Sequence, residues 1–201
     1  MKNQDRAKII ESLPFESRLA FAAFCVERCL KEAKRHPTAK KQLEKMPLLT
    51  KGLEMLWVRV ERGVEPDPKG VQAILAQPKK SQKIGSDFTT IHYAHDFMLV
   101  VAARVLARGL RLLQKPQTRP LDVAYTVGDY IAGVDTVYED REGARKSEAA
   151  VADSALLNLE KWGQKPIKRS VFNGIPEWNR GALSKDYAEH RVMGSVEDTC
   201  S

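Results

Sequence analysis

Two histidines and an aspartate lie close together in HYAHD, residues 92–96, with a spacing that could serve metal chemistry. His92 lies three residues before His95 and four before Asp96, so one face of a helix would present them together. If the chain turns near residues 116–117 into an antiparallel helix, this segment comes level with residues 137–141, which include Glu139. Histidine and carboxylate ligands on facing helices build di-metal sites in helical bundles. A metal-dependent enzyme using His92, His95, Asp96 and Glu139 is therefore one hypothesis.

The same segment has a plainer interpretation, which we favour. Di-metal bundles repeat a Glu-x-x-His pattern on two helices, and this chain has no such pair. The sequence also lacks a G-x-S-x-G motif and a phosphate-binding glycine loop. We expect a solvated helix end with local ion pairs, no catalytic residues and no cofactor.

Two cysteines, Cys25 and Cys29, are four residues apart in a strongly apolar segment. Zinc sites bring a second matching pair of ligands, and the sequence offers none. A disulfide at this spacing inside a regular helix fits bridge geometry poorly. We expect both thiols to be buried as small hydrophobic side chains, and Cys200 near the chain end to be unimportant.

The charge and hydropathy of the chain bound its partners. Its 201 residues carry 33 lysines and arginines against 26 acids, a net charge of +7. An exposed ridge of Arg104, Arg108 and Arg111, with the basic loop at 77–86, would be the surface for nucleic acid. The excess is mild for that role, and no aromatic-rich basic strand, zinc spacing or basic recognition helix reinforces it. The other basic clusters, KEAKRH with AKK and the lysines at 79–83, are interpreted as solvated faces. No secretory leader or membrane span is apparent, so we expect a cytoplasmic protein.

The elements that would position these residues are helical throughout. Apolar residues recur at helical spacing in segments 13–36, 47–63, about 87–114, about 121–140 and about 147–162. Ser12 is the expected N-cap of the first, Pro14 fits its first turn, and Gly63 is the expected stop of the second. Residues 65–70 are expected to be a loop and 71–76 a short helix. The prediction is an all-α, antiparallel bundle of about five to seven helices at 1–165, with an irregular segment at 166–201 that packs on it or extends from it.

Two of these segments carry a family resemblance. RLAFAAFCVERCL (18–30), followed by LEMLWVRVERG (53–63), resembles DUF416-like all-helical bacterial proteins and the related Imm5-like immunity proteins of polymorphic toxin systems. The resemblance implies a cytosolic binding protein that occludes a cognate toxin, and it brings no catalytic residues. Arg18, Glu27 and Arg28 in the first motif are expected to make ion pairs between helices.

Inhibitors of that kind bind through a few aromatic or charged anchors. The candidate contacts are the acidic end of the helix predicted at 121–140 and two aromatic residues of the tail. They are Asp135, Tyr138, Glu139, Asp140, Glu142, Trp178 and Tyr187.

Overall fold

A computed structural model gives the arrangement of the chain, and its description covers residues 1, 3–35, 37–44, 46–76, 94–114, 139–162 and 166–175. Every regular element in these ranges is a helix, so the all-α prediction is confirmed. The α-helices are α1 (Asn3–Ser12), α2 (Phe15–Ala33), α3 (Pro37–Glu44), α4 (Pro47–Arg62), α5 (Pro68–Ala76), α7 (Ala94–Gln114) and α9 (Arg141–Trp162). A 3-10 turn, η1 (Arg169–Phe172), follows them.

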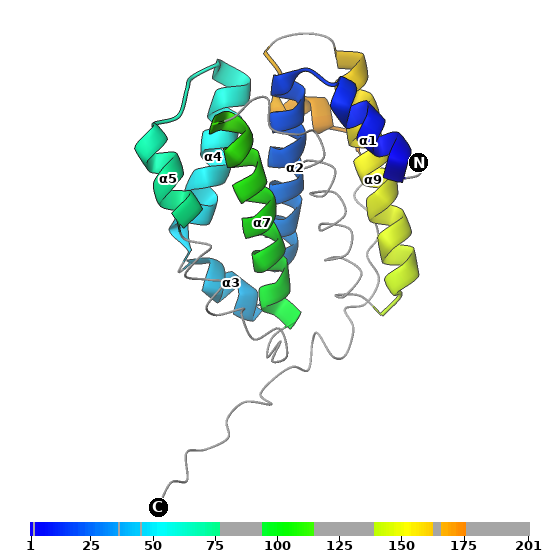
Figure 1. The fold of residues 1–201 in the computed structure, drawn as a ribbon. Coiled ribbons are helices and arrows are strands. Elements are labelled where there is room, and N and C mark those ends of the chain that lie inside the picture. Colours follow the sequence, from blue (N-terminus) through cyan, green and yellow to red (C-terminus); the bar gives the residue numbers. More distant parts are fainter. Residues whose placement is uncertain are drawn as a thin grey trace, which may run out of the picture.

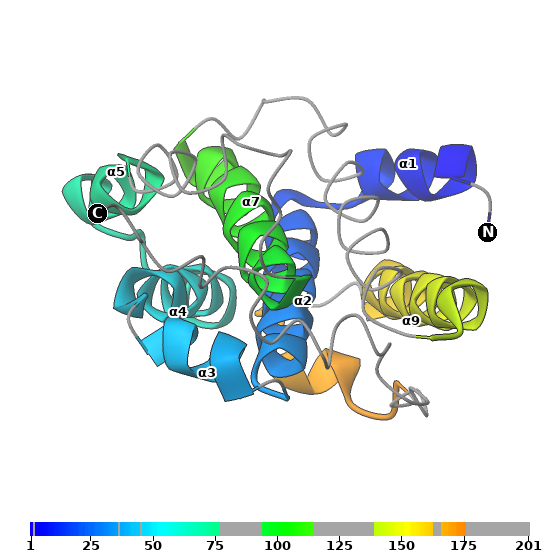
Figure 2. The same ribbon diagram turned by 90° about the horizontal axis from the view of Figure 1, so that it is seen from below.

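Helix α2 is the centre of the bundle. It packs against α7, α4, α3 and α9, and Figure 1 shows α3, α4 and α5 on one side of it and α1 and α9 on the other. Figure 2 gives the same separation from below. Its alanines Ala20, Ala22 and Ala23 are buried, and their small side chains let neighbouring helices approach closely.

A close approach of three helices lies where α7 crosses α2 and α4. A Cβ atom built on Gly109 of α7 would lie 2.9 Å from Cδ1 of Leu56 on α4 and 3.3 Å from Cβ of Ala22 on α2. Both distances are shorter than an ordinary van der Waals contact, so glycine allows these three helices to meet.

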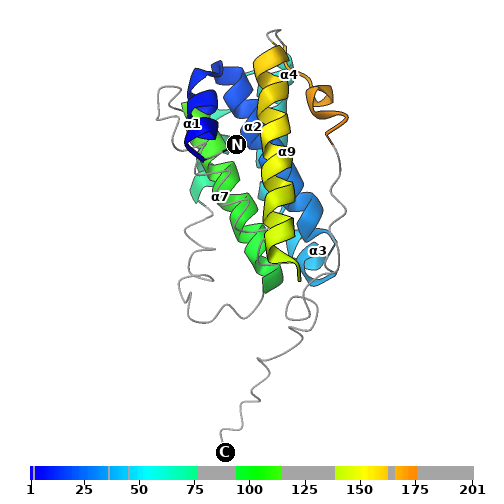
Figure 3. The same ribbon diagram turned by 90° about the vertical axis from the view of Figure 1, so that its right-hand side faces the viewer.

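Helix α1 forms the outer layer on the far side. It packs against α9 (Figure 3). Arg6 of α1 donates a hydrogen bond to Asp153 of α9, with 3.1 Å between Nη2 and Oδ2. Ile10 and Leu13 are buried, which attaches α1 to the same hydrophobic core as α2.

Several helix ends differ from the prediction, because prolines and short acidic side chains decide them. Ser12 is not the N-cap of α2: it ends α1, where its hydroxyl donates to the Ile9 carbonyl (2.8 Å). Pro14, expected in the first turn of α2, occupies the N-cap position, with extended backbone. Helix α5 begins at Pro68, inside the expected loop, since the Asp67 carboxylate accepts from the backbone N–H groups of Lys69 and Gly70.

The boundaries of α4 agree with the prediction, whereas the start of α9 does not. Helix α4 begins at Pro47 and ends before Gly63, whose φ of 68° places it in the left-handed region, as expected of a glycine stop. Helix α9 begins at Arg141, six residues before the predicted start, because Asp140 caps it. Of the predicted helix 87–114, residues 94–114 are helical and 87–93 lie outside the described ranges, as does most of the predicted 121–140 helix.

Candidate partner-binding groove

The acidic helix end proposed as a binding surface is partly described. Glu139, Asp140 and Glu142 are exposed at the start of α9. The Asp140 carboxylate accepts from the Gly143 backbone N–H (2.8 Å), and Glu142 pairs with Lys146 one turn along (2.7 Å). The hydrogen bond from Lys146 and its charge lower the pKa of Glu142. Asp135, Tyr138, Trp178 and Tyr187 lie outside the described residues.

Two of the three described acids therefore already have intramolecular partners. Asp140 satisfies a backbone donor that the helix start leaves open, which is a structural task. Glu142 would have to leave Lys146 to meet a partner's cation. The acidic end remains a prediction, and these contacts weaken it as the main binding surface.

The alternative metal set lies mostly beyond what the structure describes. His92 is outside the described residues, and the side chains of His95 and Asp96 are not described although α7 includes their backbone. Glu139 is exposed. Within the described part of the chain, no three His, Cys, Asp or Glu side chains form a group that could hold a metal ion.

The two cysteines lie in the core, as predicted. Cys25 and Cys29 are fully buried free thiols. Burial raises the pKa of both thiols far above the ordinary range, and the nearby Glu148 carboxylate adds to the effect. Such thiols stay protonated at neutral pH, so they lack the reactivity of a nucleophilic cysteine.

An ion pair beside these thiols joins α2 to α9. Arg28 donates from Nη2 to Oε1 of Glu148 (2.6 Å) and from Nε to Oε2 (3.2 Å), and both side chains are buried. This confirms the helix-to-helix pairing expected of Arg28. Glu27 makes a different contact, accepting from the Trp57 indole N–H of α4 (3.1 Å). For Arg18, no acceptor lies within reach of its buried Nε among the described residues.

The turn η1 packs against both α2 and α4 through aromatic contacts. The Phe172 ring stacks on Phe24, with centroids 4.4 Å apart, and meets Trp57 edge-on. Arg169 lies over Trp57 at 4.9 Å and donates to Glu54 (2.8 Å). The start of the predicted C-terminal segment thus packs on the bundle.

A groove between α2, α3 and α4 is the described feature that best suits a partner. We call it the α3–α4 groove. It has a cavity volume of about 640 Å³ and is open to solvent. Its lining residues are Lys34, Lys40, Leu43, Glu44, Pro47, Thr50, Lys51 and Glu54. Helix α3 ends at Glu44 and α4 begins at Pro47, and the two helices contact each other, so the groove follows their junction.

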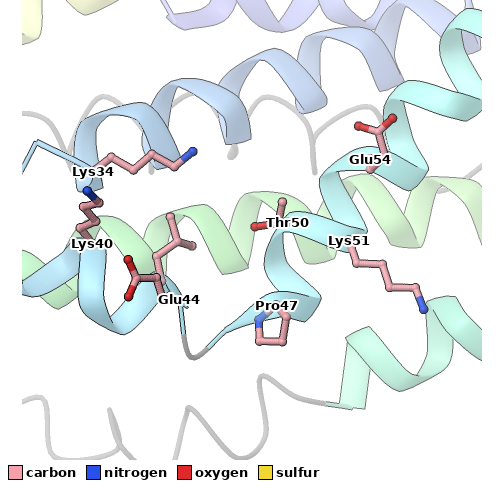
Figure 4. Close-up of a pocket in the computed structure, with 8 residues that line it drawn as sticks. Lys34, Lys40, Glu44, Pro47, Thr50, Lys51 and Glu54 are labelled. Carbon is pink, nitrogen blue, oxygen red and sulfur yellow. The ribbon is translucent and has the colours of Figure 1, made fainter.

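The lysines and the acids that line this groove differ in whether they form ion pairs within the described part of the chain. No carboxylate of the described residues lies within ion-pair distance of Lys34, Lys40 or Lys51, and all three are exposed. Glu54 is paired with Arg169. In Figure 4, Lys34 and Lys40 lie at one end of the groove, Thr50 in the middle and Lys51 at the other end.

The sequence predicts solvated faces for the basic clusters that contain Lys34 and Lys40, and it does not predict the groove. A usable signal was present: Pro37 and Pro47 bracket a helix of eight residues, which forces a tight reversal of a lysine-rich segment. The arginine ridge of α7 is partly as expected, since Arg104 and Arg111 are exposed whereas Arg108 is half-buried.

Comparison with known proteins adds no functional information. No protein-family model, curated protein or solved structure matches this chain. Among the described helices, none combines the length and the apolar character that crossing a membrane requires.

Proposed function

We propose that this protein is a cytoplasmic, immunity-type binding protein that neutralises a cognate bacterial toxin by binding and occluding it. The observation that carries the proposal is the open α3–α4 groove, on whose rim three exposed lysines have no ion-pair partner among the described residues. Unpaired charges around an apolar depression are what an inhibitor uses to guide and orient a partner. The resemblance of segments 18–30 and 53–63 to immunity proteins supports the toxin as the kind of partner.

The use of ionisable groups elsewhere agrees with a binding role. The buried pair Arg28–Glu148 and the partly buried pair Arg6–Asp153 connect helices, and the buried thiols Cys25 and Cys29 are protonated at neutral pH. These ion pairs and thiols of the described interior therefore serve the scaffold. A rigid scaffold that presents a preformed surface loses little entropy on binding, which favours a tight inhibitor.

The test is affinity capture from the native host with the tagged full chain, followed by an activity assay of the captured protein. We expect one stoichiometric partner that is toxic when expressed alone and inactive when the complex forms. A matched pair of bait variants locates the contact: Thr50→Trp fills the groove, whereas Ala73→Trp adds the same bulk on the exposed face of α5. Loss of the partner with Thr50→Trp alone is the expected result. Capture of no stoichiometric partner by the unmodified chain would contradict the proposed function.

A further inference from the structure

We infer that the α3–α4 groove binds an acidic segment of the partner, in which an apolar side chain is flanked by carboxylates. This inference rests on the proposed function and names the chemistry of the partner at the same site. Three features of the groove carry it: the sign of its charge, the character of its floor and the composition of its rim.

The sign of the charge comes from its lysines. Lys34, Lys40 and Lys51 are exposed and have no carboxylate within ion-pair distance among the described residues. Two acids also line the groove, but Glu54 is already paired with Arg169 at 2.8 Å. The positive charges of three lysines therefore outnumber the one negative charge left at Glu44, and the groove is electropositive.

The arrangement of the lysines sets where the partner's acids would lie. Lys34 and Lys40 occupy one end in Figure 4, and Lys51 occupies the other. Glu54 lies at the same end as Lys51 in this view, but its carboxylate is paired with Arg169 (2.8 Å). An acidic segment with carboxylates at both of its ends would meet cations at both ends of the groove.

The floor between these ends is apolar. Leu43, which is 7% exposed, lines the groove together with Pro47 and Thr50, and all three contribute carbon surface to it. The aliphatic stems of the lysines extend this surface. A leucine-sized side chain of the partner would bury apolar area here while its neighbours remain at the charged rim.

The rim favours a protein over a nucleic acid. None of the eight lining residues is aromatic or an arginine, so the groove has no surface on which a base would stack. Glu44 would repel the continuous phosphates of a nucleic acid strand, whereas a peptide can present an uncharged residue opposite it. The groove thus suits a segment of mixed acidic and apolar composition.

The experiment uses two synthetic peptides and the full chain. One peptide carries two glutamates on each side of a central leucine, and the other has glutamine in place of each glutamate. We expect the acidic peptide to bind about tenfold or more tightly than the glutamine peptide at low ionic strength, with affinity falling as salt screens the lysines. Amide chemical-shift changes should concentrate on α3 and the first turns of α4. Equal binding of the two peptides, or shift changes elsewhere, would overturn the inference.

A matched pair of charge variants separates the groove from the overall charge. Lys34→Glu/Lys40→Glu/Lys51→Glu reverses the rim, and Lys8→Glu/Lys69→Glu/Lys161→Glu makes the same change in net charge at exposed sites on α1, α5 and α9. The first should abolish binding of the acidic peptide, and the second should change its affinity less than about threefold. Equal losses would mean that binding follows net charge alone and would overturn the inference. Thr50→Trp, which leaves the charge intact, should also remove binding.

A single-stranded RNA of similar length serves as a competitor. RNA that displaces the acidic peptide from the groove at equal concentration would overturn the choice of a protein segment. The outcomes also distinguish this inference from the proposed function. A captured toxin that is lost with Thr50→Trp but retained by the triple lysine variant would leave the function standing and refute the acidic segment. Binding of the acidic peptide without capture of a toxin would support an acidic ligand for the groove and contradict the proposed function.

Discussion

The guanidinium of Arg28 is a charge that the core of this protein has to neutralise. It lies in the middle of the most buried helix, 8% exposed, and Glu148 of α9 supplies two acceptors while being 1% exposed itself. Removing one member of such a pair leaves an uncompensated buried charge, which costs more than the pair contributes. The pair thus fixes how α9 approaches α2.

Glu148→Ala should lower the free energy of unfolding by about 3–5 kcal/mol. The exposed neighbour Glu160→Ala, on the same helix, should change it by less than about 0.5 kcal/mol. Replacing both partners, as Arg28→Met with Glu148→Met, should recover most of the loss, because no charge is then left buried. Denaturant unfolding measures all three; a double variant no more stable than Glu148→Ala would argue against an electrostatic cause.

The thiols of Cys25 and Cys29 should be chemically silent in the folded protein. Their burial raises both pKa values, so thiolate is scarce even at mildly alkaline pH, and reagent cannot reach the sulfur atoms. In a Cys200→Ser background, a chromogenic disulfide reagent should therefore leave the native chain unlabelled and label both cysteines after denaturation. Fast labelling of the native chain would contradict the packing of α2.

At the scale of elements, the hydrogen bonds between α1 and α9 converge on one carboxylate, that of Asp153. Asp153 accepts from Arg6 and from the amino group of Met1 (2.7 Å). Partial burial by itself raises the pKa of Asp153, but the hydrogen bonds from Arg6 and the amino group lower it by more, and the net shift is downward. A carboxyl with a depressed pKa stabilises the fold above its unfolded pKa, about 4, and loses that contribution as pH falls through the folded pKa.

The stability of the protein should accordingly fall between about pH 5 and pH 2, and part of this fall belongs to Asp153. Asp153→Asn should be less stable than the parent chain at neutral pH and should show a shallower loss on acidification. Glu11→Gln, at an exposed site on α1, is the control and should keep the parent's pH dependence. Denaturant unfolding across this pH range is the measurement, and parallel curves for Asp153→Asn and the parent would refute the assignment.

At the scale of the whole molecule, one crossing point holds three helices together. Gly109 of α7 leaves room for Leu56 of α4 and Ala22 of α2, which are both buried. The Leu56 methyl could rotate away from a new side chain, but the Cβ of Ala22 is fixed to the backbone of the central helix. A larger residue at 109 must therefore move α7 as a whole.

Gly109→Val should destabilise the protein by about 2 kcal/mol or more, although valine is the better helix former. Ala73→Val, on the exposed side of α5, controls for introducing a β-branched residue into a helix and should cost no more than about 0.7 kcal/mol. Thermal or denaturant unfolding compares the two. A neutral effect at 109 would mean that α7 can shift without loss of packing.

The sequence by itself determined the helical class and the core face of α2 and α4. Apolar side chains recur there at the helical period, and that pattern depends on local geometry alone. It also predicted the burial of both cysteines and the stop at Gly63. The starts of α9 and α5 were not predicted, because each is set by one capping carboxylate, Asp140 or Asp67. The periodicity of apolar residues, from which the helices were predicted, does not show where such a cap lies.

Tertiary structure decided which charges found partners. Arg28 and Glu148 are 120 residues apart in the chain, and Arg169 reaches back to Glu54 and Glu61 of α4. No local pattern distinguishes these side chains from Lys34, Lys40 and Lys51, which folding leaves exposed around a groove. The physical reason is that pairing depends on distances between helices, which the chain's local periodicity does not specify.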